Sequence, residues 1–196
     1  MAGDLFTVVQ QGRWRGKKIP LPPSHHGHRH VTSSILKEAF FQLAEAYYPC
    51  AFFDLCAGSG QMALEAVSRG YGPVHAVELD EGRFRFLIGQ LSGHDITFHK
   101  KDFRRMAASV AAQTSVVFID VPYSYWTADG QCSHIETFLQ KLSIAVDELP
   151  VEQPNQIFIG IQSPMPVQWK KSDWLGRFRI DAKKYRGHSL TLMTIG

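Results

Sequence analysis

The sequence lacks a long hydrophobic run and has few cysteines. It has 196 residues, of which 44% are hydrophobic, but its apolar runs fall well short of the roughly 18 residues that a membrane-spanning helix needs. Residues 1–11 do not combine a charged start with an apolar block, so we expect no signal peptide and no membrane association. Cys50, Cys56 and Cys132 form no C-x-x-C pair, which fits neither a disulfide framework nor a structural zinc site. These absences predict a protein of the reducing cytoplasm.

The chain has little excess charge of either sign, but that charge is unevenly placed. Its 21 Lys and Arg against 18 Asp and Glu give a net charge of +3. Residues 1–37 hold six basic side chains and one acidic one, a net charge of +5, so the remaining chain carries −2. Such a segment is typical of a surface that faces a polyanion, and the alternative is an ordinary solvated basic terminus.

The N-terminal pattern predicts two short strands and a helix. Phe6–Gln10 and Lys17–Leu21 flank a glycine-bounded turn and suggest a small hairpin outside the main core. Apolar residues then recur at helical spacing behind capping hydroxyls, which predicts a helix from about Ser34 to Tyr48. We therefore divide the chain into an arm with a hairpin and a basic, His-rich stretch at 1–32 and a main domain at 33–196.

From residue 51 onward, short apolar runs alternate with amphipathic stretches. The runs are Ala51–Leu55, Val74–Leu79, Ile96–His99, Val116–Ile119 and Ile157–Ile161, and the helical stretches lie near 60–69, 81–91, 103–112 and 133–148. This alternation predicts an α/β fold with a mostly parallel sheet covered by helices on both faces. Arg177–Lys184 and Leu190–Ile195 predict a terminal antiparallel hairpin at the sheet edge, which gives seven strands in all.

The loop after the first apolar run is the strongest candidate for cofactor binding. In open parallel sheets, ligands bind beyond the carboxyl ends of the strands. Asp54–Gly60 contains two glycines, Gly58 and Gly60, that allow a tight turn and a close approach of the backbone to a ligand. Glu78 ends the next run, where a carboxylate can accept hydrogen bonds from ribose hydroxyls. This spacing predicts a cofactor that contains a nucleoside.

The charges at these strand ends favour S-adenosylmethionine over a dinucleotide. The glycine loop also satisfies the loose dinucleotide pattern G-x-G-x-x-A. However, Asp54 places a carboxylate where a cationic amine is better accommodated than a pyrophosphate, and Asp102 follows the third run, where it could accept from an adenine amine. We expect cofactor contacts at Asp54, Ala57, Gly58, Ser59, Gly60, Glu78, Leu79, Asp102 and Phe103. Each acid by itself could instead be a helix cap or a turn residue.

The loop after the fourth run is the candidate catalytic loop. An exocyclic amine on a nucleobase is a poor nucleophile because its lone pair is delocalised into the ring. Asp120 and the carbonyl of Val121 could accept hydrogen bonds from such an amine, and Tyr123, which follows Pro122, could stack on an unpaired or flipped base. The alternative is a strand-ending turn with a half-buried tyrosine.

At this point the sequence resembles the bacterial small-subunit rRNA guanine-N2 methyltransferases of the RsmD type, within the class I S-adenosylmethionine-dependent fold. The resemblance begins at Gly12–Ile19, similar to the family's G-x-W-R-G-R-x-L, and continues through Thr32–Ser33 and Lys37–Phe41. It is closest at Asp54–Gly60 and Glu65–Gly70. The resemblance implies a Rossmann-like fold, S-adenosylmethionine as the methyl donor and a guanine exocyclic amine in small-subunit rRNA as the target.

Two departures from the family concern the choice of target. The family's D-P-P-Y is Asp120-Val121-Pro122-Tyr123 here, so one proline is lost while the acid, the carbonyl and the aromatic ring remain. His30 replaces a residue that is usually arginine. The alternative hypotheses for the function are a DNA amine methyltransferase, a nicotinamide-dependent dehydrogenase and a non-catalytic RNA-binding or ribosome-assembly module.

The basic arm is the candidate RNA-binding surface. We expect contacts with RNA phosphates at Arg13, Arg15, Lys17, Lys18 and His30. The histidines at 25, 26, 28 and 30 lie in a Pro/Gly-rich stretch without helical spacing, so we expect no metal there. The expected partner is ribosomal RNA or an assembling small ribosomal subunit, bound by a monomer.

Overall fold

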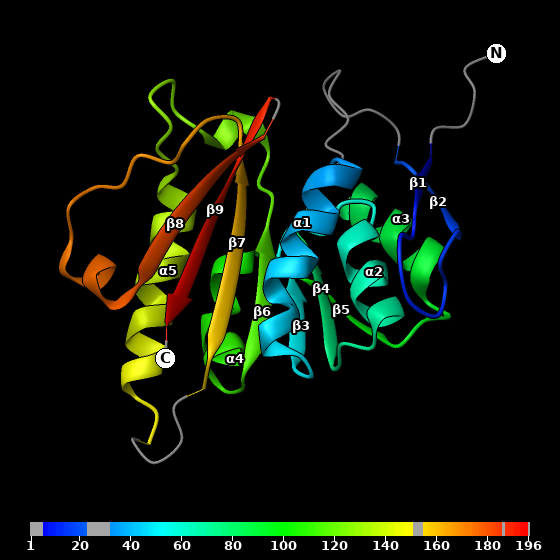
Figure 1. The fold of residues 1–196 in the computed structure, drawn as a ribbon, viewed down its shortest axis with the longest axis horizontal. Coiled ribbons are helices and arrows are strands. Elements are labelled where there is room, and N and C mark those ends of the chain that lie inside the picture. The colour runs from blue at the N-terminus through cyan, green and yellow to red at the C-terminus, as the bar shows by residue number, and fades with distance from the viewer. Residues whose placement is uncertain (1–5, 23–31, 151–154, 186, 196) are drawn as a thin grey trace.

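A computed structural model describes residues 6–22, 32–150, 155–185 and 187–195 (Figure 1). The strands are β1 (Phe6–Val8), β2 (Lys18–Pro20), β3 (Ala51–Asp54), β4 (Val74–Glu78), β5 (Ile96–Lys100), β6 (Ser115–Ile119), β7 (Ile157–Ser163), β8 (Arg179–Tyr185) and β9 (His188–Ile195). The α-helices are α1 (Ser34–Ala44), α2 (Gln61–Arg69), α3 (Glu81–Leu91), α4 (Ala107–Ala111) and α5 (Ser133–Asp147). Short 3-10 helices are η1 (Glu45–Tyr47), η2 (Phe103–Arg105), η3 (Tyr123–Tyr125) and η4 (Asp173–Arg177).

One seven-stranded sheet organises the molecule, in the order β5-β4-β3-β6-β7-β9-β8. The first five strands of this order are parallel, β9 is antiparallel to β7, and β8 is antiparallel to β9. The central strands β3, β6 and β7 are buried along their whole length, as parallel strands covered on both faces are. The predicted α/β sheet with a terminal antiparallel hairpin is therefore confirmed.

Helices cover both faces of this sheet (Figure 1). Residues of α1, α2 and α3 pack with one set of strand side chains in a first core, in which Phe40 stands edge-on to Phe118 at 5.0 Å. Residues of α4 and α5 pack with the alternate strand side chains, including Phe53 and Ile159, in a second core. Because successive side chains of a strand point to opposite faces, neighbouring residues of each strand belong to different cores.

The N-terminal hairpin belongs to the first core, so the expectation that it lies outside the main core was wrong. Strands β1 and β2 pair with each other in a separate two-stranded sheet. Val9 and Ile19 are each only 1% exposed and pack among the residues of the first core. A two-stranded hairpin is marginally stable alone and needs a surface to pack on. The division of the chain after residue 32 stays a prediction.

A buried group of charges fastens the hairpin to α1 and α2. The side chain of Glu65 in α2 is 0% exposed and lies 3.0 Å from the ammonium group of Lys37 in α1, which is 1% exposed. Glu65 also pairs with Arg69 at 2.9 Å and accepts hydrogen bonds from the backbone N–H groups of Gln10 and Gln11. Lys37 donates in addition to the carbonyl of Val8. Burial lowers the pKa of Lys37, and the neighbouring Glu65 opposes that shift.

Local hydrogen bonds explain where two predicted helices differ from the structure. Ser33 caps α1 as expected, because its hydroxyl accepts from the N–H of Leu36. The predicted helix over 34–48 is α-helical only to Ala44 and continues as the single 3-10 turn of η1. The predicted helix over 103–112 is divided into η2 and α4, because the Asp102 carboxylate caps a tight turn at the start of this stretch.

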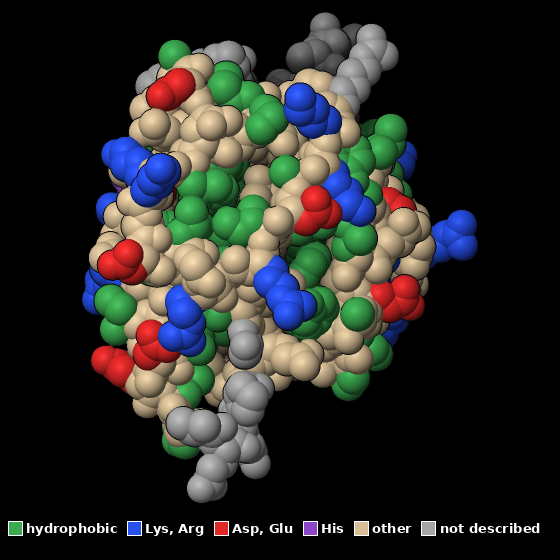
Figure 2. All heavy atoms as spheres, turned by 60° about the vertical axis from the view of Figure 1, so that its left-hand side comes forward, with side chains coloured by type: hydrophobic (Ala, Val, Ile, Leu, Met, Phe, Trp, Pro, Cys, Tyr) green, Lys and Arg blue, Asp and Glu red, His purple; other side chains and the backbone are tan. Residues whose placement is uncertain are grey.

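The free edge of the sheet on the β8 side carries charged residues. Arg179, Asp181 and Lys184 are exposed on β8, and charges on an edge strand discourage pairing with another chain. Figure 2 shows this side of the molecule, with basic, acidic and hydrophobic side chains interspersed over its surface. Within the described ranges, no helix has the length and apolar character needed to span a membrane.

The buried carboxylate of Glu65 gives a stability prediction. We expect Glu65→Gln to lower the free energy of unfolding by about 3 to 5 kcal/mol, because it leaves a buried lysine without its counter-charge. The matched control is Glu81→Gln, which removes an exposed carboxylate that pairs with Arg85 and should cost less than about 1 kcal/mol. Urea unfolding followed by circular dichroism measures both. Equal effects of the two substitutions would contradict the central role of Glu65.

Candidate active site

The glycine loop between β3 and α2 makes the tight turn that the sequence predicted, but its two glycines are required for different reasons. Gly58 and Gly60 have φ values of +52° and +76°, which favour glycine. A Cβ at Gly60 would come within 2.3 Å of Leu91 and 2.6 Å of Leu87, so Gly60 is needed for packing against α3. A Cβ at Gly58 would meet only the carbonyl of Cys56, at 4.0 Å. Gly58 is therefore the glycine that leaves the backbone open to a ligand.

Glu78 joins the end of β4 to the glycine loop. One of its carboxylate oxygens accepts from the N–H of Gly58 at 3.0 Å, and the other accepts from the N–H of Asp80 at 2.9 Å. The two bonds fix the orientation of the carboxylate. Each oxygen can accept a further hydrogen bond, so the group remains able to bind ribose hydroxyls.

Asp54 is buried beneath this loop. Its carboxylate accepts from the N–H of Ala63 in the first turn of α2, at 3.1 Å, and so holds the start of that helix against β3. Burial raises the pKa of Asp54 to about 8; the bond from Ala63 opposes this shift, and the charges of Asp120 and Glu78 add to it. The two other predicted loop residues, Ala57 and Ser59, are also buried.

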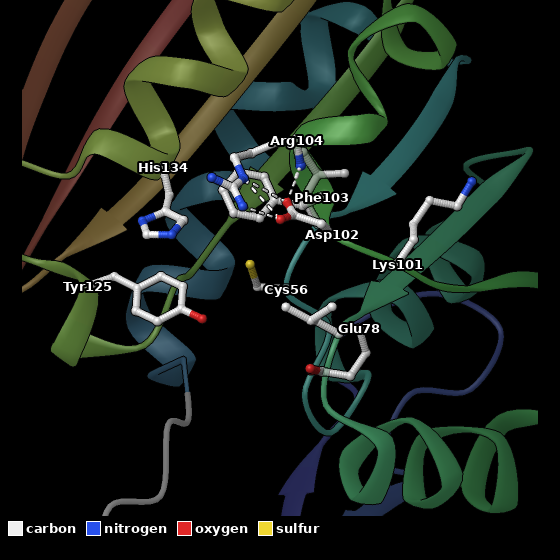
Figure 3. A pocket seen from close by; sticks show the side chains of 10 residues that line it. Cys56, Glu78, Lys101, Asp102, Phe103, Arg104, Tyr125 and His134 are labelled. Carbon is white, nitrogen blue, oxygen red and sulfur yellow. Dashed lines mark hydrogen bonds and ion pairs between the residues drawn. The ribbon is translucent and has the colours of Figure 1, made fainter.

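A pocket opens at the carboxyl ends of β3, β4 and β5 (Figure 3). Four of the predicted cofactor residues line it, namely Glu78, Leu79, Asp102 and Phe103. The remaining lining residues are Leu55, Cys56, Lys101, Arg104, Tyr125 and His134. The structure therefore brings together side chains from the ends of three successive strands, as the loop positions predicted.

Asp102 does not face this pocket as a free acid. Arg104 holds both of its oxygens, with its Nε 3.0 Å from each, and the backbone N–H of Arg104 donates to one of them at 2.9 Å (Figure 3). The hydrogen bonds from the Arg104 side chain lower the pKa of Asp102 against the opposing effect of burial. A carboxylate fixed in its ionised form can still accept from an adenine amine, so this role stays a prediction.

Two aromatic side chains in the pocket were missed from the sequence. Tyr125 in η3 stacks on His134 in the first turn of α5, with ring centroids 4.5 Å apart and planes 22° apart. They border the pocket on the side across from Lys101 (Figure 3). The signal that could have found them is position, because both follow β6 at the sheet end where ligands bind.

Asp120 lies in the candidate catalytic loop, and its two carboxylate oxygens differ in their surroundings. Its Oδ2 lies 3.4 Å from the hydroxyl of Thr32, just before α1. Its Oδ1 is buried and has no hydrogen-bond partner among the described residues. Burial raises the pKa of Asp120 to about 7, while Thr32 and Arg83 favour the charged form. A buried acceptor left without a partner costs about 1 to 3 kcal/mol, so Oδ1 indicates where a ligand's hydrogen-bond donor is expected.

Two contacts hold the remaining residues of the candidate catalytic loop in place. Val121, which replaces the family's proline, is completely buried in the second core. Pro122 and Tyr123 are partly exposed at the loop surface. The hydroxyl of Tyr123 lies 2.7 Å from Nδ1 of His188 at the start of β9.

The charge of this region suits a cationic ligand. Asp54, Glu78 and Asp120 lie close enough for the last two to raise the pKa of the first. Because the pKa of Asp54 is about 8, this group is largely protonated at neutral pH, and a bound cation favours its ionised form where an anion would oppose it. S-adenosylmethionine carries a sulfonium and an ammonium group, whereas a dinucleotide brings an anionic pyrophosphate. The residues present therefore fit S-adenosylmethionine.

The basic residues of the arm lie away from the catalytic loop. The backbone of Arg13 bonds the carbonyl of Ser68 near the end of α2, and Lys17 contacts His94 beyond the end of α3. Helix α2 begins at the glycine loop, at the carboxyl end of β3, and rises by about 1.5 Å per residue, so it ends toward the amino ends of the strands (Figure 1). Asp120 follows the carboxyl end of β6.

All four described basic residues of the arm are exposed: Arg13, Arg15, Lys17 and Lys18. The Lys18 ammonium lies over the ring of Phe6 at 4.2 Å. His30 and the histidine cluster at 25, 26, 28 and 30 lie outside the described residues. The predicted contacts with RNA stay predictions.

Comparison with known proteins gives matches in sequence and in fold. The family described as conserved hypothetical protein 95 matches residues 7–159. The chain is 30% identical over 161 residues to the ribosomal RNA small subunit methyltransferase D of Escherichia coli K12, covering 81% of this chain and 78% of that protein.

Solved structures share the fold. A putative methyltransferase from Escherichia coli superposes with a TM-score of 0.65 at 19% identity, covering 97% of this chain and 98% of that one. An S-adenosylmethionine-dependent O-methyltransferase from Thermotoga maritima superposes with a TM-score of 0.57 at 13% identity, covering 87% and 68% of the two chains. The arrangement of strands and helices is thus that of class I methyltransferases.

The raised pKa of Asp54 predicts a pH dependence of stability. Folding favours the protonated form of a carboxyl whose pKa is raised to about 8, so its contribution is complete below about pH 4 and is lost as the pH rises toward 8. Asp54→Asn keeps an acceptor for Ala63 but cannot ionise. Relative to wild type, this variant should gain about 1 kcal/mol or more in unfolding free energy between pH 5 and pH 8.

Urea unfolding at the two pH values tests this effect, with the exposed Asp95→Asn as the matched control. An identical pH dependence in wild type and Asp54→Asn would show that Asp54 does not titrate in this range.

Proposed function

The chain belongs to the family described as conserved hypothetical protein 95, and on this premise we propose that it transfers a methyl group from S-adenosylmethionine to the exocyclic amine of a guanine in small-subunit ribosomal RNA. The name of the Escherichia coli relative specifies ribosomal RNA of the small subunit. The observation that carries the proposal is the buried Oδ1 of Asp120, which has no hydrogen-bond partner among the described residues. Asp120 lies close enough to Cys56, a lining residue of the pocket, for its charge to raise the pKa of that thiol.

Different residues of the site bind different parts of the cofactor. Glu78 accepts from the ribose hydroxyls, and Asp102 with Phe103 borders the adenine. Gly58 allows the close approach of the backbone, and the negative potential around Asp54 favours the methionine ammonium. When bound, S-adenosylmethionine supplies an electrophilic methyl group on a positively charged sulfur.

The catalytic loop holds the target amine. Asp120 Oδ1 accepts one N–H of the amine, and the carbonyl of Val121 is the second acceptor, so the nitrogen lone pair is directed away from both. Tyr123 stacks on the base, which must be unpaired or flipped out to reach the loop. The amine nitrogen gains the methyl group as the bond between that methyl and the sulfur breaks, with the electron pair left on a neutral thioether, and the nitrogen gives up one proton. Asp120, with a pKa of about 7, is suited to receive that proton near neutral pH.

The arm provides a second contact with the RNA. Its exposed arginines and lysines reach phosphates at a distance from the reacting base, and this contact positions the RNA without reading its sequence. We infer that a monomer acts on the RNA or on an assembling small subunit, in the cytoplasm.

Methyl transfer and its dependence on Asp120 test the proposal directly. The wild-type protein should transfer labelled methyl from S-adenosylmethionine to undermodified small ribosomal subunits, and nucleoside analysis should identify a methylated guanosine amine. Asp120→Ala should lower the rate by about 100-fold or more, because it loses the acceptor for the amine. Its affinity for S-adenosylmethionine by calorimetry should fall far less than the rate, because Asp120 adds only a nearby charge to the cofactor site. The exposed Asp181→Ala is the control. Full activity of Asp120→Ala would rule out this catalytic role.

The arm predicts a change in salt dependence. Replacing Arg13 and Arg15 together by alanine should weaken RNA binding and reduce the slope of log affinity against log salt by about 1.4 to 1.8, since each lost phosphate contact contributes roughly 0.7 to 0.9. Filter binding at several salt concentrations measures this slope. Alanines at the exposed Lys170 and Lys171 are the matched control. An unchanged slope would mean that the two arginines are merely solvated.

A further inference from the structure

Two buried acceptor oxygens lie on adjacent strands at the catalytic end of the sheet. Ile119 of β6 pairs with Ile161 of β7, so the residues that follow, Asp120 and Gln162, continue side by side. Asp120 Oδ1 and Gln162 Oε1 are both buried, and neither has a hydrogen-bond partner among the residues that the structure describes. Gln162 as a whole is 2% exposed. Burial without a partner costs free energy, so a pair of such atoms points to a ligand with two adjacent donors.

The two side chains also face the same side of the sheet. Phe118, two residues before Asp120, packs on Phe40 of α1, and a Cβ at Gly160, two residues before Gln162, would come within 2.4 Å of the same ring. Because side chains alternate along a strand, Asp120 and Gln162 point to this side as well. The contact between Asp120 and Thr32, just before α1, agrees with this orientation.

A chain of hydrogen bonds fixes which end of the Gln162 amide is left for a ligand. Burial and the charge of Asp120 raise the pKa of Tyr123, and a hydrogen bond from the side chain of Gln162 lowers it. A hydrogen bond that lowers the pKa of a phenol is donated to its oxygen. Gln162 therefore donates its amide N–H to the Tyr123 oxygen. The same oxygen lies 2.7 Å from Nδ1 of His188, to which the Tyr123 hydroxyl donates in the tautomer that carries its proton on Nε2. This leaves the carbonyl oxygen of Gln162 as the free acceptor.

We propose that Gln162 is a specificity-determining residue. Its Oε1 accepts a hydrogen bond from the N1–H of the target guanine, while Asp120 Oδ1 accepts one from the N2 amine of the same base. This inference rests on the proposed function. Guanine carries the two donors side by side on its Watson–Crick edge. In adenine and cytosine, the ring nitrogen beside the exocyclic amine is an acceptor, so it would face the lone pairs of Gln162. Two adjacent acceptors in the protein therefore select guanine among the bases that carry an amine.

His188 and Tyr123 have a positioning role in this arrangement. As long as Tyr123 donates to His188, its oxygen can only accept from Gln162, and the amide keeps its carbonyl oxygen toward the base. Loss of either partner lets the amide rotate and present its N–H groups, which match the ring nitrogen of the wrong base.

The experiment compares guanosine with 2-aminopurine at the methylated position of the RNA. 2-Aminopurine keeps the N2 amine but has an acceptor at N1, so it isolates the contribution of Gln162. We expect wild type to favour guanosine in kcat/KM by about 100-fold, because a lost pairing leaves a buried acceptor unsatisfied. Gln162→Met, which removes the amide at similar volume, should reduce this preference by about 10-fold or more, because the rate on guanosine falls while the rate on 2-aminopurine stays the same or rises once the unsatisfied acceptor is gone.

Controls separate recognition from folding and from the proposed function. Gln90→Met, on the exposed side of α3, should keep the full preference, and affinity for S-adenosylmethionine should be unchanged in both variants. His188→Ala should lower the preference several-fold in a chain that keeps Gln162, which provides a second test if Gln162→Met folds poorly.

Three outcomes would overturn the inference. Equal losses on both bases in Gln162→Met would mean that Gln162 is structural, and an unchanged rate on guanosine would mean that it does not touch the base. Equal rates of wild type on the two bases would overturn base selection by Gln162 but leave the proposed function intact. Absence of transfer to either base by wild type, with S-adenosylmethionine bound, would overturn the proposed function itself.

Discussion

The buried carboxylate of Glu65 is the contact on which the fold and the position of the site both depend. It receives Lys37 from α1, Arg69 from α2 and two backbone N–H groups from the segment after β1. Isolated buried charges are costly, and here each charge has several partners, so the three segments are held in one arrangement. Since α1 begins beside Thr32 and α2 begins at the glycine loop, this contact also fixes the elements that carry the two halves of the site.

Electrostatics then decide what the site accepts. Asp54, Glu78 and Asp120 gather where three parallel strands end, and their mutual repulsion, added to burial, raises the pKa of Asp54. A cationic ligand relieves this repulsion, whereas a pyrophosphate would increase it. Glycine loops of similar sequence serve both kinds of cofactor, so the neighbouring carboxylates distinguish the two cases better than the loop pattern does.

The candidate catalytic end of the sheet combines segments that are far apart in the chain. Thr32 precedes α1, Asp120 and Tyr123 follow β6, Gln162 is the penultimate residue of β7 and His188 begins β9. Their hydrogen bonds use one oxygen of Asp120 and the amide nitrogen of Gln162. Within the part of the chain that the structure describes, one acceptor oxygen on each side chain has no partner. The substitution of Val121 for proline leaves this arrangement supported from the second core, where the valine is completely buried. The direction of each bond follows from the neighbours of each group and not from the loop sequence.

The sequence by itself determined the order and type of the main elements, the glycine loop and the acids at Glu78 and Asp120, because apolar periodicity and strand-end position are local properties. Only the tertiary structure showed that the hairpin shares the main core through Val9 and Ile19 and that Arg104 holds Asp102. The same holds for the pairing of Gln162 with Asp120 across neighbouring strands. These relations depend on sheet order and on side-chain direction in space, since two residues 42 positions apart become neighbours only after β6 and β7 pair.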